Sequence, residues 1–207
     1  MKNTEGYESD LAAIRATMER SAKFMSLSGL SGILAGLYAL VGAAYAYYVI
    51  YYPEPPFGFR LYLGTESAIV LKLASTASVV LIMSLATAFV LSQQKARKMN
   101  VSIWNKPSKL LFINMAIPLA TGGIFTAIMI ANGYYILFAS STLIFYGLAL
   151  ISASQFTYRE IRWLGISEIG FGLLSAVMPG FGLVFWGIGF GLLHLVYGGI
   201  MHYRYDR

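Results

Sequence analysis

The sequence predicts an all-α integral membrane protein: a bundle of six transmembrane helices arranged as three hairpins, preceded by an N-terminal amphipathic helix. Hydrophobic residues make up 57% of the 207 residues and charged residues 12%, whereas a soluble domain carries roughly 25% charged residues. The apolar residues form runs long enough to cross a bilayer, which takes about 20 helical residues. We expect an interfacial helix at residues 1–23, a membrane domain at residues 24–203 and a cytoplasmic tail at residues 204–207.

The segment before the first apolar run has the pattern of an amphipathic helix. Between residues 8 and 23, Leu11, Ile14 and Met18 recur at helical spacing, and charged residues fill positions between them. This pattern is typical of a helix that lies in the membrane interface. A regulatory or partner-binding helix is the alternative interpretation.

The first hairpin is predicted at residues 24–91, with a proline-rich loop between its two spans. Small residues recur at helical spacing in the first span, where Gly32 and Gly36 form a GxxxG motif that marks a close contact between helices. The second span contains Lys72. This lysine either snorkels to the interface and pairs with Glu66, or forms an anion-binding or proton-coupled site with it.

The loop at residues 92–109 has five basic residues and no acidic residue. Such a loop next to a membrane attracts anionic headgroups, and Trp104 is typical of the interface. We therefore expect anionic lipids to be contacted by Lys95, Arg97, Lys98, Lys106 and Lys109.

The second hairpin is predicted at residues 110–156. Its first span carries Asn114 and Pro118 on one face, so the proline is expected to kink the helix and the asparagine to satisfy a freed backbone group. Its second span holds several internal polar residues, among them Tyr146. Asn114 is also a candidate for a polar site inside the membrane.

The third hairpin, at residues 165–203, contains two ionisable residues, Glu168 and His194. Small residues three and four positions away put both on close-packed helix faces. Glu168 precedes Pro179 by eleven residues and His194 follows Gly180 by fourteen. At about 1.5 Å per residue, the two side chains lie within roughly 5 Å of the same depth. The sequence therefore predicts a Glu–His pair inside the membrane. The alternatives are a purely structural hydrogen bond, or a glutamate wetted at the inner surface.

The arrangement of glycines around Pro179-Gly180 makes this hairpin resemble the repeated hairpin of the HdeD-type acid-resistance membrane proteins. The glycines that carry the resemblance are Gly165, Gly172, Gly187 and Gly198. The first hairpin departs from the family through its proline-rich loop and Lys72, and the second lacks the proline turn. The resemblance implies a six-span bacterial inner-membrane protein built from three hairpins, linked to stress and not an enzyme.

The basic residues also predict the orientation of the chain. Thirteen of its fifteen lysines and arginines fall in segments on one side of the predicted spans; Arg60 lies on the other side and Lys72 within a span. The positive-inside rule then places both termini and the loop at residues 92–109 in the cytoplasm. We expect a multi-pass protein of the cell inner (plasma) membrane.

Composition excludes several classes of function. The chain has no cysteine, and its two histidines, His194 and His202, are eight residues apart on one predicted helix, which is poor spacing for a shared metal ion. We expect no cofactor, no metal, no nucleic-acid partner and no enzymatic activity. The net charge of +6 comes from membrane-flanking segments, where it favours lipid contacts.

Two functions fit these features. The first is a transporter- or channel-like protein for a small ion or solute, with homo-oligomers expected, whose polar site would comprise Lys72, Asn114, Glu168, His194 and Glu66. The alternative is a regulatory, sensory or stress-linked accessory membrane protein without transport activity.

Overall fold

The computed structural model describes residues 23–52 and 67–206, and these residues contain helices but no strand. The all-α class is therefore confirmed. The predicted N-terminal helix falls almost wholly outside the described residues, and so does Glu66. The helices are α2 (Gly29–Tyr51), α3 (Ser67–Lys98), α4 (Lys106–Ala131), α5 (Phe138–Ala153), α6 (Glu160–Val177), α7 (Gly182–Trp186) and α8 (His194–Tyr205).

Short helical segments of other types complete the chain. The 3-10 helices Tyr135–Leu137 and Ser154–Phe156 flank α5. A π-helix, Gly187–Leu193, joins α7 to α8, so these three segments form one continuous but irregular helix.

Five helical stretches within the described residues are long and apolar enough to cross a membrane: Gly29–Tyr51, Ile69–Lys98, Lys106–Ala131, Tyr135–Phe156 and Gly182–Tyr205. The remaining long helix, α6, carries three charged residues, Glu160, Arg162 and Glu168. These three charges fall within only 18 residues, and α6 is not among the five stretches. These helices are compatible with a multi-pass membrane protein.

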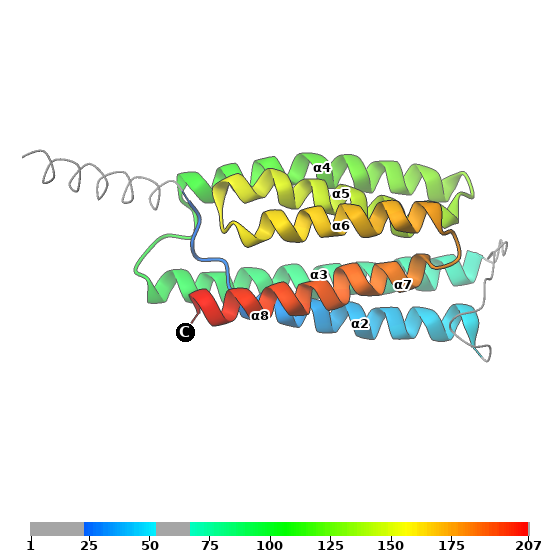
Figure 1. Ribbon diagram of the computed structural model, residues 1–207, viewed down its shortest axis with the longest axis horizontal. Helices are drawn as coiled ribbons and strands as arrows, with labels where there is room; N and C mark the ends of the chain where they lie inside the picture. Colours follow the sequence, from blue (N-terminus) through cyan, green and yellow to red (C-terminus); the bar gives the residue numbers. More distant parts are fainter. Residues whose placement is uncertain (1–22, 53–66, 207) are drawn as a thin grey trace, which may run out of the picture.

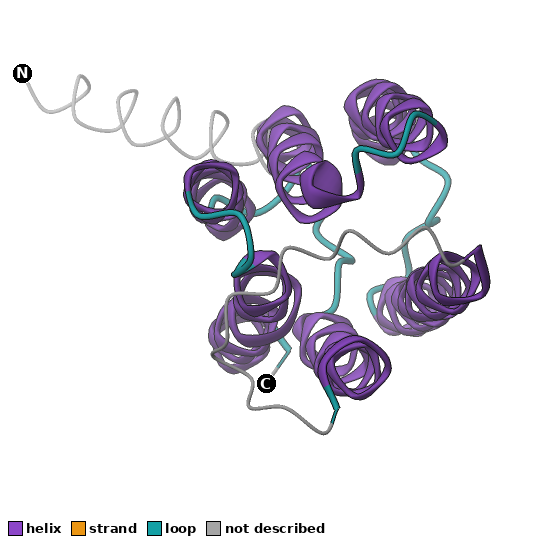
Figure 2. Ribbon diagram, turned by 90° about the vertical axis from the view of Figure 1, so that its right-hand side faces the viewer, coloured by secondary structure: helices purple, strands orange, loops and turns teal. Residues whose placement is uncertain are grey.

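The helices lie in two layers, with α4, α5 and α6 in one layer and α3, α2 and the α7–α8 segment in the other (Figure 1). Within the layers, α5 packs on α4 and α6, whereas α2 packs on α3 and α8. The layers meet where α5 packs on α7 and where α6 packs on α7, on the π-helix and on α8. An end-on view shows the layers facing each other (Figure 2).

This packing differs from three separate hairpins. The pairs α2–α3 and α4–α5 do pack together, but α6 packs mainly on α5, and α8 packs mainly on α2. The reason is the distribution of glycines, which allow close backbone contact on faces that point to these other helices.

The α2–α8 contact is built by the small residues that the sequence marked. A Cβ atom added at Gly29 would lie 2.1 Å from the backbone nitrogen of His202, and one at Gly198 would lie 2.5 Å from that of Ile33. The GxxxG residue Gly36 would clash in the same way with the Gly191 carbonyl oxygen, at 2.7 Å. Only glycine therefore permits this approach of the two backbones.

The α5–α6 contact uses the same device. Added Cβ atoms at Gly147 and Gly165 would lie 2.6 Å and 2.7 Å from each other's carbonyl oxygens. Glu168 follows Gly165 by one helical turn, so the contact that brings α6 against α5 also turns the glutamate toward the interior. Its side chain is completely buried.

Candidate functional site

The structure brings Glu168 and His194 together, as the hairpin geometry predicted. The Oε1 atom of Glu168 lies 3.4 Å from Nδ1 of His194, and the two side chains are 0% and 8% exposed. Glu168 comes from the middle of α6, and His194 is the first residue of α8. A carboxyl group and an imidazole therefore face each other inside the bundle.

Both ring nitrogens of His194 have further partners. Nδ1 lies 3.1 Å from the carbonyl oxygen of Gly189, and Nε2 lies 2.8 Å from the hydroxyl oxygen of Tyr146. A carbonyl oxygen only accepts hydrogen bonds, so Nδ1 carries the proton that points to Gly189. In the neutral ring Nε2 is then the acceptor, and the Tyr146 hydroxyl donates to it.

The π-helix shapes the site. Its wider turns follow an i→i+5 pattern and often mark functional positions in helices. It places Gly189 directly against the glutamate, because a Cβ atom there would lie 2.5 Å from Glu168 Oε2 and 2.4 Å from Leu143 Cδ2. The absence of a side chain at residue 189 is what leaves room for the carboxyl group.

The carboxyl group of Glu168 is poorly satisfied. Among the described residues, no hydrogen-bond partner reaches either of its oxygens, and the Oγ atom of Ser175, two turns further along α6, is also buried without one. An ionised carboxylate in such a place is costly unless a partner compensates it. A proton on the carboxyl group, or one shared with His194, removes that cost.

Aromatic rings enclose the pair. The ring of His194 stacks on Tyr146 with centroids 5.4 Å apart, and Phe190 packs on Tyr146 at 5.0 Å. The surroundings of the two ionisable groups are therefore largely apolar, which strengthens any electrostatic interaction between them.

The other predicted site residues do not join this pair. Lys72 has an exposed side chain on α3, a helix that packs chiefly on α2. Asn114 lies on α4, where its Nδ2 donates to the carbonyl oxygen of Leu110 at 2.8 Å. The carbonyl that Pro118 leaves without a helical donor is that of Asn114 itself, four residues earlier, so the asparagine side chain serves a different group from the one expected.

A second polar cluster, which the sequence did not reveal, surrounds Asp206 at the end of α8. Its Oδ1 accepts from Lys95 Nζ at 2.6 Å. Its Oδ2 accepts from Ser28 Oγ at 3.0 Å, from the backbone N–H of Gly29 at 2.8 Å and from His202 Nδ1 at 3.2 Å. Asp206 thus supplies the acceptor at the N-terminus of α2, where the carboxylate also meets the positive end of the helix dipole.

Lys95 extends this cluster to the connection between α5 and α6. Its Nζ donates to the Leu27 carbonyl oxygen at 3.0 Å and to the Tyr158 hydroxyl at 3.1 Å, and that hydroxyl in turn donates to the Met25 carbonyl oxygen. Partial burial opposes ionisation of Asp206. Hydrogen bonds from Lys95 and His202, together with the charge of Lys95, nevertheless hold the pKa of its carboxyl group below the usual value. This cluster joins the start of α2 to the ends of α3 and α8.

The segment predicted as a basic loop, residues 92–109, forms the end of α3, a short connection and the start of α4, and its basic residues fall into two groups. Lys95 is committed to internal partners and its side chain is only 14% exposed. The side chains that face outward are those of Arg97, Lys98, Lys106 and Lys109. These four residues remain available for the headgroup contacts that the sequence predicts.

No group of three or more metal-ligating side chains forms a candidate metal site in the described part of the chain. Comparisons with models of known protein families, with curated proteins and with solved structures find no match to this chain. The resemblance to the HdeD-type proteins accordingly remains a prediction from the last hairpin.

Proposed function

We propose that the protein is a multi-pass protein of the plasma membrane that binds and releases a proton at the site formed by Glu168, His194 and Tyr146, and that it acts as a small proton-coupled transporter or channel. The observation that carries this proposal is the buried carboxyl group with no hydrogen-bond partner among the described residues, placed 3.4 Å from an imidazole. Ionisable groups inside membrane helices are costly and mark ion and proton pathways.

The proposed chemistry is a proton exchange between two groups. With the proton on Glu168, both the carboxyl group and His194 are neutral. Release of that proton leaves a carboxylate at Glu168. Because Nδ1 of His194 already carries a proton, uptake of a proton at Nε2 then makes His194 a cation with N–H groups at both ring nitrogens. Nδ1 then faces the Glu168 carboxylate and Nε2 donates to the Tyr146 hydroxyl oxygen. Both states use contacts within reach of the observed positions, at 3.4 Å and 2.8 Å.

The proposal includes six spans: the five apolar stretches named above and, in addition, α6. The three charges of α6 are compatible with spanning. Glu168 faces the interior, and Glu160 and Arg162 lie in the first turn at the helix end, where Glu160 bonds Arg204. Both termini and the loop between α3 and α4 are then cytoplasmic by the positive-inside rule. The four exposed basic residues at the ends of α3 and α4 that flank this loop lie where anionic headgroups would contact them.

One observation favours the alternative of a sensory or accessory protein. The large pocket of the bundle, described below, is not lined by Lys72, Asn114, Glu168 or His194. In this second interpretation the proton changes the packing of α6 against α8, and nothing crosses the membrane.

Proton flux into liposomes tests the proposal. The purified protein is reconstituted with a trapped pH-sensitive dye, and an imposed potassium potential drives protons inward. We expect flux from the unaltered protein and none from Glu168→Gln or His194→Ala. The matched control is Glu160→Gln, which changes an acid at the end of the same helix and should retain flux. Full flux in both site variants would refute the assignment.

If the unaltered protein passes no protons, hydrogen exchange at two pH values distinguishes the remaining possibilities. A pH-dependent change in the protection of α6 and α8 that Glu168→Gln abolishes would support the sensory alternative.

A further inference from the structure

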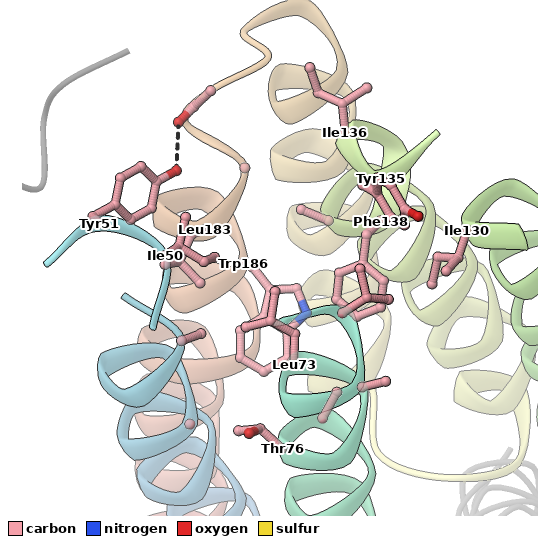
Figure 3. Close-up of a pocket in the computed structure, with 18 residues that line it drawn as sticks. Ile50, Tyr51, Leu73, Thr76, Ile130, Tyr135, Ile136, Phe138, Leu183 and Trp186 are labelled. Carbon is pink, nitrogen blue, oxygen red and sulfur yellow. Dashed lines mark hydrogen bonds between the residues drawn. The ribbon is translucent and has the colours of Figure 1, made fainter. Parts of the chain in front are cut away.

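A pocket of about 210 Å³ lies between the two layers, and its lining residue Trp186 packs on Phe190 beside the Glu168 site. Its walls come from the ends of α2 and α4, from the first turns of α3, α5 and α7, and from the turn before α7 (Figure 3). Small side chains leave the space open, among them Gly42, Ala74, Ala77, Ala139 and Gly182. For comparison, a dry apolar cavity of about 150 Å³ is large enough to bind benzene.

The lining is almost entirely apolar. Trp186 projects into the middle of the pocket, with Leu73 and Phe138 beside it (Figure 3). The hydroxyl of Tyr51 is directed to the Gly180 carbonyl oxygen, 3.5 Å away. Water gains little in such a space because it needs two to four polar partners. An apolar occupant suits it better.

The pocket runs from the helix ends toward the middle of the bundle. Tyr51 is the last residue of α2, and Gly42, nine residues earlier on the same helix, also lines the pocket. At 1.5 Å per residue the two are about 13 Å apart along the helix axis. This is the direction in which a hydrocarbon chain enters a bilayer from a headgroup at the surface.

The pocket also has a side on which the layers are not joined. In the chain, α4 follows α3, yet α3 packs chiefly on α2 and α4 on α5, and the two share no extended interface. Both contribute pocket residues, such as Leu73 from α3 and Ile130 from α4. In a membrane, the medium outside this side is lipid hydrocarbon.

We propose that this pocket binds one acyl chain of a bilayer phospholipid, which enters between α3 and α4 with its headgroup near Tyr51 and Tyr135. The occupant is identified by the apolar lining, by the depth that the pocket spans and by the lack of an extended α3–α4 interface, which lets membrane lipid approach between these helices. The site is separate from the proton site, since none of Glu168, His194 and Tyr146 lines it.

Quenching of Trp186 fluorescence by brominated lipid tests the proposal. A background with Trp104→Phe and Trp163→Phe leaves Trp186 as the single tryptophan, since the chain has three. The protein is reconstituted in phosphatidylcholine with bromine on the acyl chains and, separately, in unbrominated phosphatidylcholine. Bromine quenches tryptophan on contact, so we expect strong quenching only in the first.

Substitutions that fill the pocket distinguish quenching by a lipid inside it from quenching by lipid on the outer surface of the bundle. Ala77→Phe puts a ring into the space from α3 and should remove most of the quenching. Ala86→Phe is the matched control: this residue is exposed on the same helix and does not line the pocket, so quenching should persist. Ala74→Phe, one turn before Ala77 on the same wall, serves if Ala77→Phe does not fold.

Two results would overturn the proposal. Trp186 that is not quenched by brominated lipid would mean that another occupant, such as a different part of the chain or a second copy, fills the pocket. Equal quenching in the unfilled and filled variants would mean that the lipid contact lies outside it. Glu168→Gln should leave quenching unchanged, so a failure of the proton site and a failure of the lipid site are distinguishable.

Discussion

Two acidic residues in this protein, one partly buried and one completely buried, have opposite surroundings. Asp206 is 10% exposed and its two carboxylate oxygens accept hydrogen bonds from Lys95, Ser28, Gly29 and His202. Glu168 is completely buried, and no described residue forms a hydrogen bond with either of its oxygens. The less buried acid is thus the better satisfied one.

The difference between these surroundings indicates a structural role for one acid and a functional role for the other. A polar network whose members are all satisfied stabilises and specifies a fold, whereas an unsatisfied buried group costs free energy. Titratable groups in such unfavourable surroundings are found preferentially at functional sites. We therefore assign the joining of helix ends to Asp206 and proton exchange to Glu168.

The largest expected effect on stability comes from Asp206→Ala. The change leaves the Lys95 ammonium, only 14% exposed, without its counter-charge, and removes the acceptor at the start of α2. Loss of one partner of a fully buried pair costs about 3–5 kcal/mol, so we expect about 3 kcal/mol for this partly buried pair. Thermal unfolding in detergent measures it. Glu160→Gln is the control, since its partner Arg204 is 61% exposed and an ion pair with an exposed partner is worth about 0–1 kcal/mol. Similar melting temperatures for the two variants would contradict the structural role of Asp206.

The same cluster sets a pH dependence of stability. The folded-state pKa of Asp206 lies below its usual value of 3.8, so its contribution is complete above the unfolded-state pKa and is lost as the pH falls through the folded-state value. The gap in melting temperature between the unaltered protein and Asp206→Asn should be constant near neutral pH and shrink below about pH 4. A gap that does not change in acid would rule out this ionised cluster.

Gly189→Ala should disturb the proton site. The added methyl group would lie 2.5 Å from Glu168 Oε2 and 2.4 Å from Leu143 Cδ2, and overpacking of this kind costs about 1–3 kcal/mol. The carboxyl group has to move away from His194, so proton flux should fall together with the melting temperature. Gly199→Ala is the matched control, because a Cβ atom there meets nothing within 4 Å. Equal flux in both variants would show that the close approach at residue 189 is not required.

Tyr146→Phe should have the smallest effect of this series. It removes the hydroxyl that lies 2.8 Å from His194 Nε2 but keeps the ring that stacks on the imidazole. A hydrogen bond of this type contributes about 1 kcal/mol. We expect reduced but measurable proton flux and a small decrease in melting temperature. Complete loss of flux would show that Tyr146 carries the proton itself and does not only position His194.

The sequence was sufficient to predict the features that depend on local spacing. Glu168 and His194 could be paired because both distances are counted from one turn, at Pro179-Gly180. The glycine stripe of the first span could be recognised for the same reason. Helical periodicity and rise alone determine both predictions.

The features that depend on which helices pack against each other could not be predicted. Tyr146 reaches His194 only because α5 lies against the interior, and Lys72 is excluded because α3 is peripheral. Spacing within one helix does not say which helix will face it. The Asp206 cluster was missed because a single acid in a basic tail gave no pattern, although its four-residue spacing from His202 was a usable sign of a contact.

Infrared difference spectroscopy across a pH step tests the contrast between the two acids most directly. Protonated carboxyl groups have a C=O stretching band that ionised carboxylates lack, so the method reports which acid takes up the proton. We predict a protonated-carboxyl band at acidic to neutral pH that disappears in Glu168→Gln and persists in Asp206→Asn. A spectrum unchanged by Glu168→Gln, or a band that depends on Asp206 instead, would contradict the proposed proton site.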